Sequence, residues 1–387
     1  MKLEQLTDEQ TKLMFQVRDE WMSLAFDGHK KGIDKPKFEQ GVKWLYETIL
    51  EKPMPKVVYC SSWISCILTI DILKKMSNSE KFKLKIGKAI DAQVDAQVWA
   101  QVGAQVDAQV WDQVDAQVGD QVDAQVGAQV RAQVWAQVWD QVRDQVWDQV
   151  RAQKDLSNIF GEYSTRLSWS NWGWVSFHDF FDRIGVTSHS NFREFKSLLQ
   201  SNCFMAYEYE GFIFAIQPPV EIQRNESGQL HNPAGEAVKF MDGSGCWFIN
   251  GRSVPQKLFN GFTKEDFMNE TNEDIRGAMF EIIEAKGEGS MLAFLEAAEF
   301  NRETIVHASD DLEELILYRT DKSFPELQDL NGKSNVPLCW LRFVCPSTGQ
   351  QYLINTDASF KTASEAAKFH RPEEVPFDLD YSWHSRN

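Results

Sequence analysis

Four residues in the second half of the chain have side chains suited to acid–base chemistry and anion binding: His231, Glu270, Asn272 and Arg276. An imidazole titrates near neutral pH, so His231 could act as a general acid or base. A guanidinium can hold a carboxylate or phosphate through paired hydrogen bonds, so Arg276 could hold an anion. If the region around His231 packs against a helix that begins at Asn272, the four side chains would line one cleft.

Structural roles account for the same four residues, and we favour them. Asn272 has the side chain of a helix N-cap, and Glu270 would complement the positive end of the helix dipole. Arg276 would pair with a carboxylate, and His231 would fill a turn. The sequence contains no nucleophile elbow, phosphate loop, dinucleotide-binding glycine run or His-Glu-x-x-His motif. It therefore predicts neither a cofactor nor a metal, and it leaves the catalytic residues of any enzyme unknown.

Charge and composition exclude several classes of partner. The 387 residues include 40 basic and 57 acidic side chains, a net charge of -17, which opposes binding to nucleic acid or to an anionic membrane. The most apolar run, Val57–Ile70, is shorter than the roughly 20 residues of a membrane helix. The polar N-terminal sequence and six cysteines without a Cys-x-x-Cys pair indicate a cytoplasmic protein with reduced thiols.

The most specific feature of the sequence is a tandem array. Residues Asp91–Val150 consist of fifteen consecutive tetrapeptides, x-(Ala/Asp)-Gln-Val, in which x is Asp, Trp, Gly or Arg, and a decaying unit, Arg151–Lys154, follows. As a β-solenoid, the array would place aspartates beside valines on a buried face, at a cost of several kcal/mol for each unpaired carboxylate. As an α-helix, it would place those aspartates at the edge of an apolar sector, where they reach water, and glutamine on the far side. We favour the helix and keep the β-solenoid and disorder as alternatives. The aspartates that a solenoid would bury are Asp112, Asp120, Asp140, Asp144 and Asp148. The tryptophans that a helix would place in the middle of its apolar sector are Trp99, Trp111, Trp135, Trp139 and Trp147.

A period of four does not match the α-helix. Four residues advance about 400°, so the valine row would drift by about 40° with each unit. We therefore expect the helix to break, most plausibly at Gly103, Gly119 and Gly127, because glycine weakens a helix. Charge also divides the array, since Asp91–Val126 contains seven aspartates and no lysine or arginine.

Outside the array, helical spacing alternates with short extended segments. Thr7 and Gln10 form a capping-box pair before a helix, Glu210-Gly211 separates two candidate strands, and Asn250-Gly251 is typical of a two-residue hairpin turn. The fold class is α+β, mainly helical in the N-terminal part and the array, with small antiparallel hairpins in the C-terminal half. The predicted regions are a helical region at 1–89, the array at 90–154, helices plus a hairpin at 155–219, a β-hairpin region at 220–255 and an α+β region at 256–387.

Several short motifs carry a resemblance to a known family. They are the tetrapeptide runs, Arg18–Trp21, Pro218-Pro219, Leu230-His231-Asn232, Asp242-Gly243 and the series Glu270, Asn272, Asp274, Ile275 and Arg276. By these residues the chain resembles, along nearly its whole length, a family of uncharacterised, mostly bacterial proteins, a domain of unknown function. The resemblance implies no activity.

Two hypotheses about function follow. A fifteen-unit array repeats one surface many times, which favours an interaction or structural protein with an extensible array and a protein partner, here a cytoplasmic one. The sequence leaves the oligomeric state unknown. The alternative is an enzyme with its site around His231, Glu270 and Arg276.

Overall fold

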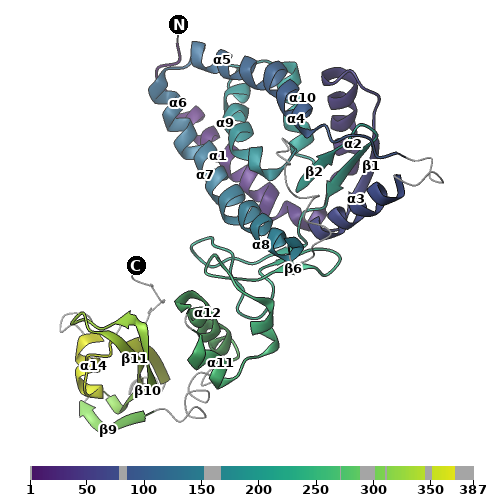
Figure 1. Cartoon of the computed structure of the whole chain (residues 1–387). Helices are drawn as coiled ribbons and strands as arrows, with labels where there is room; N and C mark the ends of the chain where they lie inside the picture. Colours follow the sequence, from purple (N-terminus) through teal and green to yellow (C-terminus); the bar gives the residue numbers. More distant parts are fainter. Residues whose placement is uncertain are drawn as a thin grey trace. The chain divides into compact units, whose positions relative to one another are not determined.

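The computed structural model describes residues 2–77, 85–151, 167–270, 272–287, 301–309, 312–344 and 351–370. The chain divides into two compact units, Met1–Gln256 and Lys257–Asn387, and each is described by itself (Figure 1). Helices and small sheets occur together, so the chain is α+β, as the sequence predicts.

The first unit is built mainly of helices. Helix α1 (Asp8–Phe26) begins at the capping box of Thr7 and Gln10, and it buries one side chain at every third or fourth position, from Met14 to Ala25. The other helices outside the array are η1 (Gly28–Lys31), α2 (Lys35–Trp44), η2 (Leu45–Ile49), α3 (Trp63–Ser77), η7 (Trp169–Asn171), α9 (Trp172–Arg183) and α10 (Ser190–Leu199).

A three-stranded sheet lies in the core of this unit. Strands β1 (Lys56–Cys60), β2 (Met205–Glu208) and β3 (Phe212–Ile216) are ordered β1-β3-β2, with β1 parallel and β2 antiparallel to β3. The hairpin predicted around Glu210-Gly211 is β2–β3. Every residue of these two strands is buried, because helices cover the sheet.

Residues 91–113 and 116–151 of the array are helical. The array alternates α-helical and π-helical stretches: α4 (Asp91–Val98), η3 (Trp99–Gly103), α5 (Ala104–Gln113), α6 (Ala116–Val122), η4 (Asp123–Gly127), α7 (Ala128–Val130), η5 (Arg131–Trp139) and α8 (Asp140–Arg151), of which η3, η4 and η5 are π-helical. A π-turn contains about one residue more than an α-turn, so it rotates less per residue. The mixture brings the mean turn close to four residues. Consequently the expected drift of the valine row does not accumulate: all valines from Val94 to Val150 are at most 3% exposed.

A four-residue turn places the positions of the tetrapeptide about 90° apart. Valine faces the core, and the Ala/Asp position faces away from it, so this position is exposed in every unit except at Ala128 and Asp140, which are half-buried. None of the aspartates at this position is buried, as expected for a helix. Glutamine does not lie on the far side, which corrects the sequence-based prediction. Gln145 is only 8% exposed, and its amide bonds to the backbone of Trp247.

The array breaks at a different place from that predicted. Val114 is extended, and Leu3 pairs with the broken backbone: its N–H donates to the Gln113 carbonyl at 2.8 Å, and its carbonyl accepts from Asp115 N–H at 3.0 Å. Asp115 then caps α6 through the N–H of Gln117. The break is stabilised by these contacts and not by glycine.

The three glycines expected at breaks lie instead at close contacts inside continuous helix. A Cβ at Gly103 would fall 2.4 Å from the indole of Trp99, and a Cβ at Gly119 would fall 2.9 Å from that of Trp111. At Gly127 it would fall 3.1 Å from the carbonyl oxygen of Gly173 in α9. A side chain at any of these positions would force a neighbour to shift, and at Gly127 that neighbour is the backbone of another helix.

The first unit ends in short hairpins. Strands β4 (Glu221–Ile222), β5 (Val238–Lys239) and β6 (Gly245–Cys246) form one antiparallel sheet, and β7 (Phe248–Ile249) pairs with β8 (Arg252–Ser253). Between β7 and β8, Asn250 and Gly251 have φ of 48° and 75°, the two positive values of a type I′ turn. The predicted hairpin turn is confirmed.

The second unit combines helices with one four-stranded antiparallel sheet of order β12-β11-β10-β9. Its elements are η8 (Gln256–Asn260), which spans the boundary, α11 (Lys264–Asn269), α12 (Glu273–Glu284), β9 (Asn301–Ser309), β10 (Leu312–Gln328), β11 (Ser334–Val344), β12 (Gln351–Thr356) and α14 (Ala363–His370). Ala363 and Ala366 of α14 pack on Leu317 and Leu341 of the sheet.

Candidate functional site

Three of the four residues singled out by the sequence meet at the start of α12. The Asn272 side chain accepts hydrogen bonds from the backbone N–H groups of Asp274 and Ile275 at 2.9 and 3.3 Å. Glu270 accepts from the N–H of Asn272 at 2.9 Å, and Arg276 Nη1 donates to the Glu270 carbonyl at 2.8 Å. These contacts satisfy backbone groups that a helix start leaves without intrahelical partners.

The other contacts of Arg276 and those of His231 also support the fold. Arg276 is 5% exposed, and its guanidinium lies 4.3 Å from the ring centre of Phe324, where it stacks on an aromatic face. His231 belongs to the other unit. Its Nδ1 accepts from the backbone N–H of Asn250 at 3.1 Å and so supports the β7–β8 turn. An enzyme site formed by these four residues stays a prediction.

The break in the array carries an exposed aromatic side chain beside carboxylates. We call the surface formed by Trp111, Asp112, Asp115 and Asp120 the array bend. Trp111 is 48% exposed, although the sequence places it in the middle of an apolar sector. Its indole lies over Gly119, next to Asp120, and both Asp112 and Asp120 are exposed. The helix axis changes direction at Val114, between α5 and α6 (Figure 1), and the Trp111 ring of α5 contacts Gly119 of α6.

The charge of the array bend is negative. No lysine or arginine occurs between Asp91 and Val130, although Lys2 Nζ donates to the Trp111 carbonyl at 3.3 Å. Asp107 does not contribute to the bend, because its carboxylate turns inward and contacts His178 Nε2 at 2.7 Å. Burial lowers the pKa of His178 despite this carboxylate. The accessible charge therefore comes from Asp112 and Asp120.

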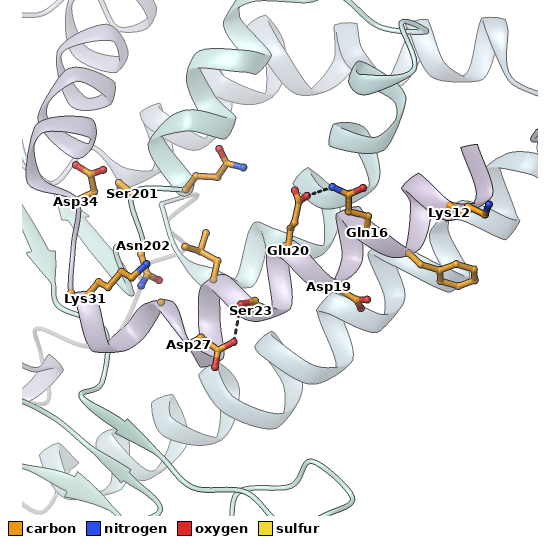
Figure 2. Close-up of a pocket in the computed structure, with 15 residues that line it drawn as sticks. Lys12, Gln16, Asp19, Glu20, Ser23, Asp27, Lys31, Asp34, Ser201 and Asn202 are labelled. Carbon is orange, nitrogen blue, oxygen red and sulfur yellow. Dashed lines mark hydrogen bonds between the residues drawn. The ribbon is translucent and has the colours of Figure 1, made fainter. Parts of the chain in front are cut away.

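A long depression follows one face of α1, and we call it the α1 groove (Figure 2). Its volume is ≈1090 Å³. The wall residues recur every three or four positions along α1 because they share one helix face. They are Lys12, Phe15, Gln16, Asp19, Glu20, Ser23, Leu24 and Asp27, followed by Gly28, Lys31, Gly32, Asp34, Gln200, Ser201 and Asn202.

Asn202 is the least satisfied polar side chain of the groove. It follows α10 with a φ of +64°, a conformation that asparagine tolerates better than most residues. The residue is 3% exposed, and neither Nδ2 nor Oδ1 has a hydrogen-bond partner in the described part of the chain. A buried polar group without a partner costs about 1–3 kcal/mol.

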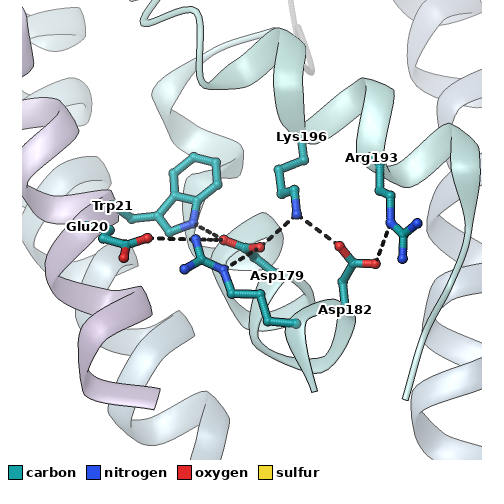
Figure 3. A network of polar contacts seen from close by, with 7 residues as sticks. Glu20, Trp21, Asp179, Asp182, Arg193 and Lys196 are labelled. Atoms are coloured by element: carbon teal, nitrogen blue, oxygen red, sulfur yellow. Dashed lines mark hydrogen bonds and ion pairs between the residues drawn. The ribbon is translucent and has the colours of Figure 1, made fainter. Parts of the chain in front are cut away.

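A buried ion network fixes the helix that forms the groove wall (Figure 3). The Asp179 carboxylate accepts from Trp21 Nε1 at 3.0 Å, from Lys196 Nζ at 2.8 Å, and from Arg183 through two nitrogens at 3.1 and 3.0 Å. Burial alone would raise the pKa of Asp179, but hydrogen bonds from Arg183 and Lys196 lower it below its ordinary value. Arg183 also pairs with Glu20 at 2.7 Å, which ties α1 to α9 and lowers the pKa of Glu20.

The chain was compared with protein-family models, curated proteins and solved structures, and none of them matches. Membership of a family of uncharacterised bacterial proteins therefore stays a prediction. Within the described residues, no helix is long and apolar enough to cross a membrane, and no group of His, Cys, Asp and Glu side chains is placed to hold a metal.

Sequence reasoning missed both the α1 groove and the ion network. An asparagine just after a helix is a usual signal for a left-handed residue, and Ser201-Asn202 after α10 carries it. That signal gives the backbone conformation of Asn202, but it does not reveal that the amide is buried without a partner.

Proposed function

We propose that the chain is a cytoplasmic interaction protein whose array bend binds a basic segment of a partner protein. One observation supports the proposal above the others. The Trp111 indole of α5 is 48% exposed and lies against Gly119 of α6, and the residues that follow Trp111 and Gly119 in the sequence, Asp112 and Asp120, are both exposed.

The chemistry of this surface suits arginine or lysine side chains. Tryptophan is enriched among the residues that dominate protein interfaces, and its ring attracts a cation by about 0.5–2 kcal/mol. The exposed carboxylates of the array bend would hasten encounter with a basic partner. The net charge of -17 favours the same class of partner.

The rest of the array supports a role in binding more than in catalysis. Its outward row presents alanine or aspartate at every turn, so neighbouring turns offer nearly the same surface. A repeated surface suits a partner of extended shape, whereas chemistry requires one distinct arrangement of groups. The array would then serve as the extensible part of an interaction protein.

A binding titration with the full chain tests the proposal. A fluorescent deca-arginine peptide is titrated and its anisotropy measured, with the double variant Asp112→Asn/Asp120→Asn compared with Asp144→Asn/Asp148→Asn. Both variants remove two charges from the same repeat position of the array, and Asp144 and Asp148 are exposed too. We expect the bend variant to lose at least fivefold in affinity and the control less than twofold.

Trp111→Ala should weaken binding by a similar factor, because the variant removes the aromatic face but no charge. Equal losses in the two double variants would show that only net charge matters. That result, or full affinity in Trp111→Ala, would refute the array bend as the binding surface.

A further inference from the structure

The α1 groove is a second binding site, separate from the array bend. We propose that it holds an extended peptide, one peptide group of which pairs with the amide of Asn202, and that the peptide carries a positive charge next to that group.

The length of the groove fits a short stretch of extended chain. Its wall on α1 runs from Lys12 to Asp27, which at 1.5 Å per residue is about 22 Å. An extended peptide covers about 3.3 Å per residue, so about seven residues would fill this length. The volume of ≈1090 Å³ slightly exceeds the range of small-molecule sites, which is about 300–1,000 Å³. A single amino acid would leave most of it empty.

The state of Asn202 identifies the chemical group. Its Oδ1 needs a donor and its Nδ2 needs an acceptor, and both atoms are buried at the groove. A peptide group offers a donor and an acceptor together, so it can satisfy both atoms. A simple amine supplies only donors, and an inorganic anion supplies only acceptors. Either would leave half of the amide unpaired.

Two carboxylates and one lysine of the groove wall lie around Asn202. Figure 2 shows Asn202 and Lys31 between Asp34 and Asp27. The Asp34 N–H donates to the carbonyl of Ser201 at 2.9 Å, so this part of the wall adjoins Asn202 directly. Gly28, which follows Asp27, would place a Cβ 3.4 Å from Asn202 Nδ2.

Asp27 and Asp34 can each accept a further hydrogen bond from a ligand. Asp27 accepts from Ser23 through Oδ2 at 2.8 Å, and Asp34 accepts from the N–H of Lys37 through Oδ1 at 3.2 Å. Each therefore has a second carboxylate oxygen that can accept from a cation. Lys31 lies between the two carboxylates, and the Arg224 guanidinium interacts electrostatically with Asp27, so a positive group of the ligand would join or replace these cations at the free carboxylate oxygens.

Further along the groove the charges are already paired. Asp19 contacts Arg18 at 2.7 Å, and Glu20 contacts Arg183 at the same distance. The carboxylates that keep a free oxygen therefore lie at the Asn202 end. The positive group of the peptide can be its N-terminal ammonium or a lysine side chain, and both would be recognised through the same carboxylates.

Isothermal titration of the full chain with four defined probes tests the inference. The probes are Ser-Ala-Ser-Ala-Ser-Ala-Ser with a free N-terminus, the same peptide acetylated, the acetylated peptide with a central lysine, and spermidine. We expect at least one of the two charged peptides to bind, the neutral acetylated peptide to bind at least tenfold more weakly, and spermidine not to compete. The identity of the charged peptide that binds shows whether the groove recognises an N-terminal ammonium or a lysine side chain.

Asn202→Gly is the decisive variant. Glycine adopts a φ of +64° without strain, so the variant should melt no earlier than the natural chain and should lose at least tenfold in affinity. Asn335→Gly is the matched control, because Asn335 also has a positive φ, of 59°, and is exposed in the other unit.

Three results would overturn the inference: no binding by either charged peptide, unchanged affinity in Asn202→Gly, or full displacement of the bound peptide by spermidine. Asp112→Asn/Asp120→Asn should bind these probes as the natural chain does. Failure at the array bend would therefore leave the groove result intact.

Discussion

Replacing Asp179 with asparagine should lower the free energy of unfolding of the first unit by about 2–3 kcal/mol. The substitution keeps the shape of the side chain and removes the charge that holds Arg183 and Lys196. Removing one partner of a buried pair usually costs about 3–5 kcal/mol, because the other charge is left alone. Here Arg183 keeps Glu20 at 2.7 Å and Lys196 keeps Asp182 at 2.9 Å, so we expect a smaller loss.

Urea denaturation followed by circular dichroism measures this loss. Asp182→Asn is the control, since one of its partners, Arg193, is 55% exposed and its ion pair is screened by water. We expect about 1 kcal/mol for this control. A loss below 0.5 kcal/mol in Asp179→Asn would refute the view that the network holds α1, α9 and α10 together.

The pH dependence of the same variant gives an independent check. The pKa of Asp179 is lowered in the folded protein, so its contribution is complete above the unfolded value of about 4 and is lost as pH falls towards the folded value. The natural chain should therefore lose more stability than Asp179→Asn between about pH 5 and pH 2. Parallel curves for the two proteins would contradict the lowered pKa.

Three further predictions follow from packing. Gly173→Ala should lower the free energy of unfolding by about 1–3 kcal/mol, because the new Cβ would lie 2.8 Å from the carbonyl oxygen of Gly127. Gly277→Ala is the control in α12: nothing lies within 4 Å of its new Cβ, so it should stabilise the protein by up to about 1 kcal/mol. Thermal melts that shift in the same direction for both variants would contradict this account. Deleting the tetrapeptide Arg131–Val134 should lower the melting temperature less than deleting the three residues Arg131–Gln133, because only the shorter deletion rotates the later valines out of the core; the reverse order would refute a four-residue turn. Asn272→Ala should cost about 1 kcal/mol in the second unit by urea denaturation, as the loss of an N-cap does, and no change would exclude the capping role.

Local signals predicted local structure well. Thr7 with Gln10, Asn250-Gly251 and Asn272 each specify a backbone conformation through their own side chains or φ preference, and the structure has a capping box, a hairpin turn and an N-cap there. Each of these depends on contacts within a few residues of the chain, which is why sequence spacing is sufficient.

Features that depend on distant contacts could not be predicted. The break at Val114 requires the backbone of Leu3, and Gly127 is required by the backbone of Gly173 in another helix. The same limit applies to the α1 groove, because Asn202 meets α1 only after folding. The predicted drift of the valine row was wrong because it assumed a uniform α-helix, whereas the π-helical stretches bring the mean turn close to four residues.

A turn that contains a whole number of residues has a consequence for how the gene can change. Twelve nucleotides encode one tetrapeptide, so slippage during DNA replication gains or loses whole units. In an ordinary α-helix each such event would turn everything after it by about 40°. In a four-residue turn the event shifts the following helix by about 6 Å along its axis, and each valine still faces the core. The number of repeat units can therefore change from one generation to the next while the valine row stays buried, provided that the ends of the array accommodate the shift.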